Sequence, residues 1–458
     1  MTDLSKRVSS LVLAVLFAAT VAEPAAAREF KFIRDTEIEN TIRVFSTPVF
    51  QAAGLDPSAI EVYIVSDSTL NAFVAGGQKL FLNTGLLMQS ADAGQLIGVI
   101  AHEAGHIAGG DLARIHDVMR KSSAQQILAM VLGAAAGIAS GRGDLGAAVA
   151  AGGARAGQEN FFQYSRSQES AADAAAMRFL DATGTPATGL RDFLGTLADQ
   201  ELLSTRFQDP YLRTHPITRE RISALDNHIK QSARPTAPLS SEYKRLHERM
   251  QAKLQAFLEP PARTLKRFPE SDTSLPARYA RAIAYYKVPD LEKALPLIDG
   301  LIAENPSDPY FHEMKGQMLF ENRRAAEAIP PYEAAVKLLP ASPLLRLDLA
   351  RIQLETNDPA MLDPAIENLR VAQQAEPDSS WIWRNLAIAY GRKGDKGLST
   401  LALAEEAYFR GSLREAREYA KRAEKLLQGD SPAMVQAQDI LQATADLNRD
   451  GKPDKEEE

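Results

Sequence analysis

The sequence predicts a mainly α-helical chain in two parts, an N-terminal domain that includes a small β-sheet and a C-terminal stack of helix pairs. Three observations support this prediction. An apolar helical stretch runs from Ile97 to Gly109, three short β-rich segments precede it, and prolines recur at nearly constant spacing in the last third of the chain. A length of 458 residues allows two or three domains.

Composition narrows the class of protein. The formal net charge is -7 at pH 7 and the pI is near 5.7, which argues against nucleic acid as a main partner. The chain contains no cysteine. An exported form of it therefore has no disulfides, and helix packing has to supply its stability.

Residues 1–27 have the pattern of a secretory signal peptide. Lys6 and Arg7 form a basic start, Leu11 to Ala22 is a short apolar run, and the alanines that follow Pro24 offer a cleavage site. The apolar run is short for a membrane span, and the alternatives are an uncleaved anchor or an ordinary amphipathic start. We therefore expect export to the periplasm.

The next segments predict one helix and a small sheet. A helix is expected from Asp35 to Ala53, followed by a strand over residues 61–65. Residues 71–75 and 79–82 flank Gly76 and Gly77, which is typical of a hairpin.

The apolar stretch contains His102, Glu103 and His106 in the pattern H-E-x-x-H. Histidines four residues apart lie on one helix face, so both can bind one zinc ion. Zinc with three protein ligands keeps a position for water, lowers the pKa of that water to about 7, and leaves Glu103 to accept its proton. The pattern indicates peptide-bond hydrolysis. In the alternative, the histidines of a buried helix bond to backbone carbonyls, although a metal is the simplest partner for them.

A protease also needs a surface for an extended peptide. Peptides commonly pair with a sheet edge, so a strand near the metal-binding helix is a candidate. Its residues are Asn71, Ala72, Phe73 and Val74. An ordinary structural hairpin explains this segment equally well.

The third zinc ligand has to come from elsewhere in the chain. One known arrangement repeats histidine six residues after the second, but Leu112 occupies that position. The small-residue helix over 168–177 instead offers Glu169 and Asp173, one turn apart on one face. Glu169 suits a metal ligand, and Asp173 suits a proton acceptor from a ligand histidine. A solvated carboxylate pair is the alternative.

Five motifs follow one another along the chain: Asn71-Ala-Phe-Val-Ala-Gly-Gly, Asn83-Thr-Gly-Leu-Leu, His102-Glu-Ala-Gly-His, Glu169-Ser-Ala-Ala-Asp and Thr214-His-Pro-Ile-Thr-Arg-Glu-Arg-Ile. This order resembles peptidase family M48, the CAAX-prenyl-protease and HtpX type of zinc metalloprotease. The resemblance implies a zincin-type metalloprotease domain over residues 28–230 with one Zn²⁺ per chain. It also implies roles for single residues: zinc ligands His102, His106 and Glu169, general base Glu103, and Asp173 as partner of a ligand histidine.

His215 lies in the Thr-His-Pro segment of the last motif. In soluble periplasmic members of the family that this chain resembles, the matching histidine can approach the zinc. It then either supports the transition state or caps the metal in a latent form, because a fourth protein ligand displaces the catalytic water. We interpret His215 as a switch or an oxyanion-stabilising residue, with Arg219 and Arg221 as weaker candidates for the same rim.

A second apolar stretch covers residues 127–139, and Ala-rich residues 147–154 follow it. It is shorter than the roughly 20 residues that span a bilayer. We expect either a mobile lid or a helix in contact with a membrane surface, or else a buried hairpin of small-residue helices.

The remainder of the chain predicts a linker and then repeats. Residues 231–275 indicate a linker with one connecting helix, and residues 446–458 a charged tail. In between, over 276–445, Pro306, Pro340 and Pro377 lie 34 and 37 residues apart, and 34 is the tetratricopeptide period.

Positions inside these repeats agree with that period. Gly316 and Tyr332 take the small and aromatic positions of one repeat, and Trp383 opens another. The three extra residues of the third repeat fit an insertion around Pro359. The predicted fold is therefore mainly α: a zincin-type metalloprotease domain with a small β-sheet, followed by a tetratricopeptide-repeat α-solenoid that offers a surface to proteins or extended peptides.

A zinc protease followed by such repeats, behind a signal peptide, is similar to periplasmic M48 proteases of Gram-negative bacteria. The resemblance implies a zinc metalloendopeptidase of outer-membrane protein quality control that degrades misassembled β-barrel proteins and assists their assembly. Its partners would be unfolded or misassembled outer-membrane proteins and, through the repeats, the barrel assembly machinery. The alternative is a chaperone or adaptor with a latent zinc site, which the presence of Glu103 disfavours. An inner-membrane-anchored peptidase is a weaker alternative that signal cleavage would exclude.

Overall fold

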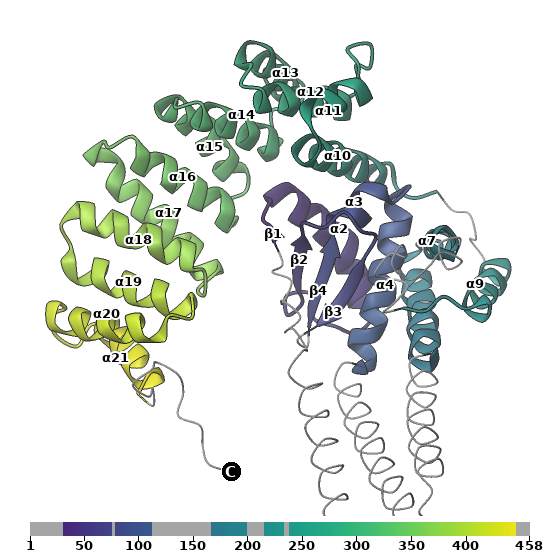
Figure 1. Ribbon diagram of the computed structural model, residues 1–458, viewed down its shortest axis with the longest axis horizontal. Coiled ribbons are helices and arrows are strands. Elements are labelled where there is room, and N and C mark those ends of the chain that lie inside the picture. Colours follow the sequence, from purple (N-terminus) through teal and green to yellow (C-terminus); the bar gives the residue numbers. More distant parts are fainter. Residues whose placement is uncertain (1–30, 76–77, 112–165, 199–214, 233–237, 446–458) are drawn as a thin grey trace, which may run out of the picture.

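The computed structural model describes residues 31–75, 78–111, 166–198, 215–232 and 238–445 (Figure 1). It is mostly helical, with one small sheet in the N-terminal part and a curved stack of helices in the C-terminal part. The expected signal peptide, the apolar stretch over 127–154 and the charged tail lie outside the described residues. Within the described ranges, no helix combines the length and the apolar character that crossing a membrane requires.

The sheet has four strands in the order β1-β2-β4-β3. Their bounds are Phe32–Ile33 (β1), Glu61–Val65 (β2), Ala72–Ala75 (β3) and Lys79–Asn83 (β4). β2 and β4 are parallel, whereas β3 pairs with β4 in antiparallel register, with Phe73 opposite Phe81. This pairing confirms the predicted strands. The sequence analysis did not predict β1, because a strand of two residues is too short to show a pattern. β3 lies at one edge of the sheet.

Helices cover one face of this sheet and form the core with it (Figure 1). α2 (Thr36–Ala52) begins where the Asp35 carboxylate accepts a hydrogen bond from the Ile38 amide, and α4 (Ala93–Gly109) begins similarly at Asp92. α3 (Thr84–Gln89) joins the sheet to α4. The apolar side chains of α2 and α4, such as Phe45 and Ile100, pack with Leu80 of β4.

Three further helical segments complete the N-terminal part. Residues 166–183 are helical, and α7 (Thr188–Ala198) and α9 (Arg219–Gln231) follow. α7 packs along α4 and also contacts α9. Ala176 and Leu180 of the helix over 166–183 lie in the same hydrophobic core as Ile100 of α4, so this helix packs in one body with the H-E-x-x-H helix.

α10 (Ser241–Leu258), within the predicted linker, packs against helices of both parts. Its Lys253 is 1% exposed, and the Lys253 Nζ atom lies 2.8 Å from Asp35 Oδ2 and 3.2 Å from Glu37 Oε2. Arg249 of the same helix pairs with Glu37 and, across to the repeats, with Asp308. A buried network of charges thus joins the two parts, because ions removed from water need partners of opposite charge.

The C-terminal part is a stack of antiparallel helix pairs (Figure 1). After α11 (Pro261–Arg267), the helices are α12 (Leu275–Lys287), α13 (Leu291–Glu304), α14 (Pro309–Glu321), α15 (Ala325–Leu338), α16 (Pro343–Glu355), α17 (Leu362–Ala375), α18 (Ser380–Lys393), α19 (Lys396–Phe409), α20 (Leu413–Leu426) and α21 (Pro432–Ala443). The stack confirms the predicted tetratricopeptide-like repeats.

Two sequence features of the repeats have a direct structural reason. A Cβ atom on Gly316 would lie 2.3 Å from the ring of Tyr332, so this helix pair packs closely only with glycine there. The expected insertion is a short 3-10 helix, Pro359–Met361, between α16 and α17. The limits of the predicted domains remain predictions.

The stack also contacts the sheet end of the N-terminal part. Arg34, directly after β1, forms a two-bond ion pair with Glu376 at the end of α17, and the Arg34 Nη2 atom lies 2.5 Å from Glu376 Oε1. These residues are 342 positions apart. The repeats therefore touch the N-terminal part at the α10 joint and again at β1.

Candidate metal centre

Four buried side chains bring metal-binding atoms together. They are His102 and His106 of α4, Glu169 of the helix over 166–183, and His215 shortly before α9. One donor atom from each lies within 4.8 Å of the others. Because the two α4 histidines are one turn apart, both rings point to the same side, as their spacing predicts.

The distances between donor atoms test whether this set suits zinc. The Nε2 atoms of His102 and His106 are 3.1 Å apart, and the two Glu169 oxygens lie 3.3 and 3.4 Å from them. His215 Nδ1 lies 3.3 Å from His102 Nε2 and 3.1 Å from Glu169 Oε1. Tetrahedral zinc with bonds of 2.0–2.1 Å has donor atoms about 3.3 Å apart. Three imidazoles and a carboxylate at these distances therefore fit a zinc ion.

Close contact between two helices allows this convergence. A Cβ atom on Gly105 would lie 2.8 Å from the backbone oxygen of Ala172, so α4 and the Glu169 helix approach at a position where only glycine fits. Gly105 lies within the H-E-x-x-H motif itself. The small residues of the motif thus bring Glu169 within reach of the histidines.

Each α4 histidine donates a hydrogen bond from its other ring nitrogen to a carboxylate. His102 Nδ1 lies 2.8 Å from Asp173 Oδ1, and His106 Nδ1 lies 2.8 Å from Asp111 Oδ2. A proton on Nδ1 leaves Nε2 free to bind metal and fixes the orientation of the ring. Sequence analysis expected this contact for Asp173 and missed Asp111. An acidic residue just after the end of the motif helix is the signal that could have revealed it.

Arg221 holds the two carboxylates of the neighbouring helix. Its Nη1 lies 2.8 Å from Glu169 Oε2, and its Nε lies 2.6 Å from Asp173 Oδ2. The same guanidinium donates to the backbone oxygen of Pro216, next to His215. Arg221 is 2% exposed, whereas Arg219 is exposed. Arg221 is therefore buried behind the donor atoms and not at the rim where the sequence interpretation had placed it.

The charges of the centre favour ionised carboxylates. Burial alone would raise the pKa of Glu169, but the three imidazoles outweigh it and hold that pKa well below the usual range. Burial likewise opposes ionisation of Asp173, and His102 with Arg221 still lowers its pKa to about 2. At neutral pH both carboxylates are therefore negative, which is the form that binds a cation.

Glu103 lies beside the donors and is fully buried. Among the described residues, neither of its carboxylate oxygens has a hydrogen-bond partner. His215 lies within ion-pair distance, with its Nε2 atom 3.5 Å from Glu103 Oε1. A buried carboxylate without hydrogen bonds is costly, so this group suits a role in which it binds a further polar molecule.

The edge strand β3 carries the candidate peptide-binding residues. α4 packs against β3, which contains Ala72, Phe73 and Val74, and Asn71 directly precedes this strand. Ala72 is buried, whereas Phe73 and Val74 are partly exposed. β3 pairs on one side with β4, and an edge strand can accept a further strand on its other side.

Comparison with known proteins identifies the domain. Residues 34–229 match the model of peptidase family M48, and residues 279–343 match a tetratricopeptide-repeat model. The chain carries an M48 peptidase domain. M48 peptidases are metalloproteases, and the M48 domain of this chain contains all four donor residues.

Three relatives share both parts of the chain. The β-barrel assembly-enhancing protease of Yersinia pestis is 24% identical over 365 residues, which cover 77% of this chain and 72% of the relative. A putative β-barrel assembly-enhancing protease of Vibrio cholerae is 25% identical over 385 residues, covering 81% and 77%. The β-barrel assembly-enhancing protease of Escherichia coli K12 is 25% identical over 378 residues, covering 77% and 72%. Each of these matches is longer than the segment that matches the M48 model, so the similarity extends beyond the M48 domain.

Proposed function

We propose that this chain is a zinc metalloendopeptidase in which His102, His106 and Glu169 bind one Zn²⁺. The observation that carries the proposal is the set of buried donor atoms, in which five donor-to-donor distances lie between 3.1 and 3.4 Å. That spacing matches tetrahedral zinc, and the M48 assignment supplies the reaction class.

In this proposal the protein residues divide the work of hydrolysis. Bound zinc would polarise the scissile carbonyl and lower the pKa of water. Glu103 takes the proton of the attacking water and delivers it to the leaving amine. Asp173 and Asp111 keep Nε2 of the two α4 histidines turned to the centre, and Arg221 keeps Glu169 in place.

We assign His215 the role of a resting cap. Its Nδ1 atom is the fourth donor of the set. In this place it occupies the coordination position that a catalytic water needs. The bond between Arg221 and the Pro216 oxygen holds the segment that carries it. Hydrolysis would then require His215 to withdraw, and substrate binding near the centre is the event that would displace it.

The substrate would bind as an added strand on the free side of β3. Main-chain hydrogen bonds to an edge strand are sequence-tolerant, which suits a protease that acts on unfolded chains. Because Ala72 to Val74 lie beside α4, a peptide paired there runs past the donor residues.

The names of the relatives suggest the biological setting. We propose export through residues 1–27 to the periplasm, degradation of misassembled outer-membrane β-barrel proteins, and docking of the repeats on the barrel assembly machinery. The second candidate is a chaperone or adaptor whose zinc is permanently capped. It is supported by the buried position of His215 among the other donors, where it can act as a fourth ligand.

Cutting of an unfolded β-barrel protein by the purified chain tests the proposal. We expect the chain to cut this substrate into fragments. Cutting should stop after treatment with a zinc chelator and resume when stoichiometric Zn²⁺ is restored. A folded barrel of the same sequence serves as the control and should stay intact. Zinc binding without any cutting, together with suppressed aggregation of the unfolded barrel, would favour the chaperone.

A further inference from the structure

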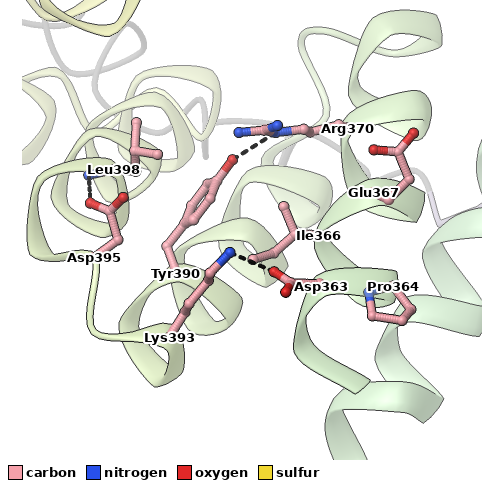
Figure 2. Close-up of a pocket in the computed structure, with 9 residues that line it drawn as sticks. All are labelled: Asp363, Pro364, Ile366, Glu367, Arg370, Tyr390, Lys393, Asp395 and Leu398. Carbon is pink, nitrogen blue, oxygen red and sulfur yellow. Dashed lines mark hydrogen bonds and ion pairs between the residues drawn. The ribbon is translucent and has the colours of Figure 1, made fainter. Parts of the chain in front are cut away.

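Helix α18 borders two hollows of the repeat stack. The first, about 570 Å³, lies between α17, α18 and the start of α19 (Figure 2). Its charged groups bind one another, since Arg370 Nε donates to the Tyr390 hydroxyl at 3.0 Å and Lys393 pairs with Asp363 at 2.5 Å. The second hollow, about 530 Å³, is lined by residues of α18 and α19. These residues are Arg384, Ala387, Ile388, Ser399, Leu403, Glu406 and Arg410.

The second hollow continues into an exposed apolar stripe. Trp381 is 65% exposed and Ile388 is 41% exposed, and both lie on α18 with Arg384 between them. The spacing of three and then four residues places all three on one helix face. The opposite face of α18 packs into the core through Ile382 and Leu386. Trp381 and Ile388 thus lie exposed on either side of a cation, and tryptophan and arginine are the side chains enriched at binding hot spots.

The charges of this hollow leave one cation unbalanced. Glu406 bonds to Arg410 at 3.1 Å, and Arg410 also pairs with Glu415 at 2.7 Å. In the parts of the repeat stack that the structure describes, no carboxylate lies within ion-pair distance of Arg384. A guanidinium between two exposed apolar side chains is complementary to a carboxylate that has apolar neighbours, because arginine can bind a carboxylate through two parallel hydrogen bonds.

We propose that Trp381, Arg384 and Ile388 bind an extended, acidic polypeptide segment. The helix rise of 1.5 Å per residue puts Trp381 and Ile388 about 10 Å apart along α18. An extended chain in the polyproline II conformation rises about 3.1 Å per residue and turns once in three residues, so residues three positions apart lie about 9 Å apart on the same side. Arg384 lies about 4.5 Å beyond Trp381, which corresponds to between one and two residues of such a chain. The preferred segment therefore has two apolar residues three positions apart with acidic residues between them. This inference concerns the repeats and does not depend on the chemistry of the metal centre.

Fluorescence anisotropy with labelled octapeptides tests this inference on the full chain. Every protein carries Glu103→Gln, so that no peptide is cut. The first peptide has the central sequence leucine-aspartate-aspartate-leucine, and its partners have lysine at both acidic positions or serine at both apolar positions. Wild-type repeats should bind the first peptide at least tenfold more tightly than either partner, and the affinity should fall with added salt.

Variants of the stripe should change this preference in defined ways. We expect Trp381→Ser to weaken binding of the acidic peptide at least tenfold. Arg384→Glu should bind the acidic peptide more weakly and the lysine peptide more tightly. An unfolded protein cannot show such an increase in affinity. The matched control is Lys393→Glu, a charge reversal on the same helix in the other hollow (Figure 2), and it should leave the affinity within about twofold. Val435→Ser removes an apolar residue of α21 that is 52% exposed, and it should also leave the affinity for the acidic peptide within about twofold.

Two results would overturn the proposal. One is that no peptide binds the wild-type repeats at millimolar concentration, or that all variants bind alike. The other is concentration-dependent self-association of the wild-type chain in sedimentation, abolished by Trp381→Ser. In that case the stripe is an interface between two copies of the chain.

Discussion

The His215 Nδ1 atom lies 3.1 Å from Glu169 Oε1, so two residues 46 positions apart contribute neighbouring donors to one centre. The other nitrogen of the same ring lies 3.5 Å from Glu103. One imidazole therefore stands between the proposed ligands and the proposed base. Its position decides whether a water molecule has access to both.

Replacing His215 by alanine should speed up peptide cutting, by roughly tenfold if the capped form dominates at rest. Three donors remain to hold zinc, and the fourth position becomes open to water. Cutting rate and zinc content per chain are measured together. His312→Ala, at a partly exposed histidine of α14, is the control. A lower rate at unchanged zinc content would instead assign His215 to support of the transition state.

Arg221→Met should destabilise the M48 domain by about 3 to 5 kcal/mol, because it leaves Glu169 and Asp173 buried without their cation. Urea unfolding of the zinc-free protein measures this free energy without any contribution from metal binding. Arg219→Met, two positions earlier on the exposed surface, should change it by less than about 0.5 kcal/mol. Equal losses in the two variants would contradict the buried role of Arg221.

Asp111→Asn should weaken zinc binding about 10- to 100-fold, since the amide holds the His106 ring less firmly than the carboxylate does. Competition with a coloured zinc chelator gives the affinity. Asp192→Asn, on an exposed residue of α7, serves as the control. Unchanged affinity would mean that the contact between Asp111 and His106 does not contribute to metal binding.

Glu313→Gln should flatten the pH dependence of thermal stability. Glu313 is buried at the α10 joint, and burial raises its pKa from 4.5 to about 8 despite the nearby charge of Lys253. Between these two values the unfolded chain releases the proton that the folded chain retains, so stability falls as pH rises. Glutamine carries no such proton. We expect the melting temperature of the variant to exceed that of the wild type increasingly from pH 5 to pH 8.

Parallel changes of the two melting temperatures over that range would contradict the raised pKa. Glu333→Gln, on α15 of the same repeat pair, provides a control substitution of the same chemistry at an exposed residue.

The sequence predicted the parts of the centre that depend on local spacing. His102 and His106 are one turn apart in any α-helix, and Glu169 and Asp173 likewise share one helix face. Strand patterning predicted the hairpin of β3 and β4, whereas the edge position of β3 is known only from the structure. The fold class was predictable for the same reason, because the repeat period is a property of the sequence.

Contacts between distant segments were not predictable in this way. The burial of Arg221 depends on how α9 packs on the Glu169 helix, and no periodicity encodes that. The joint between Lys253 and Glu37 pairs residues of α10 and α2, which only the folded chain brings together. Trp381 and Trp383 are both apolar, yet one is exposed and the other buried, because two positions along a helix point in different directions.

The most direct test of the metalloprotease account is the cutting rate of Glu103→Gln relative to the wild type at equal zinc content. Glutamine has nearly the same shape as glutamate but cannot take a proton from water. The account predicts full zinc occupancy and a rate about 10² to 10⁴ lower on an unfolded β-barrel protein. A Glu103→Gln variant that keeps its zinc and cuts at the wild-type rate would contradict it.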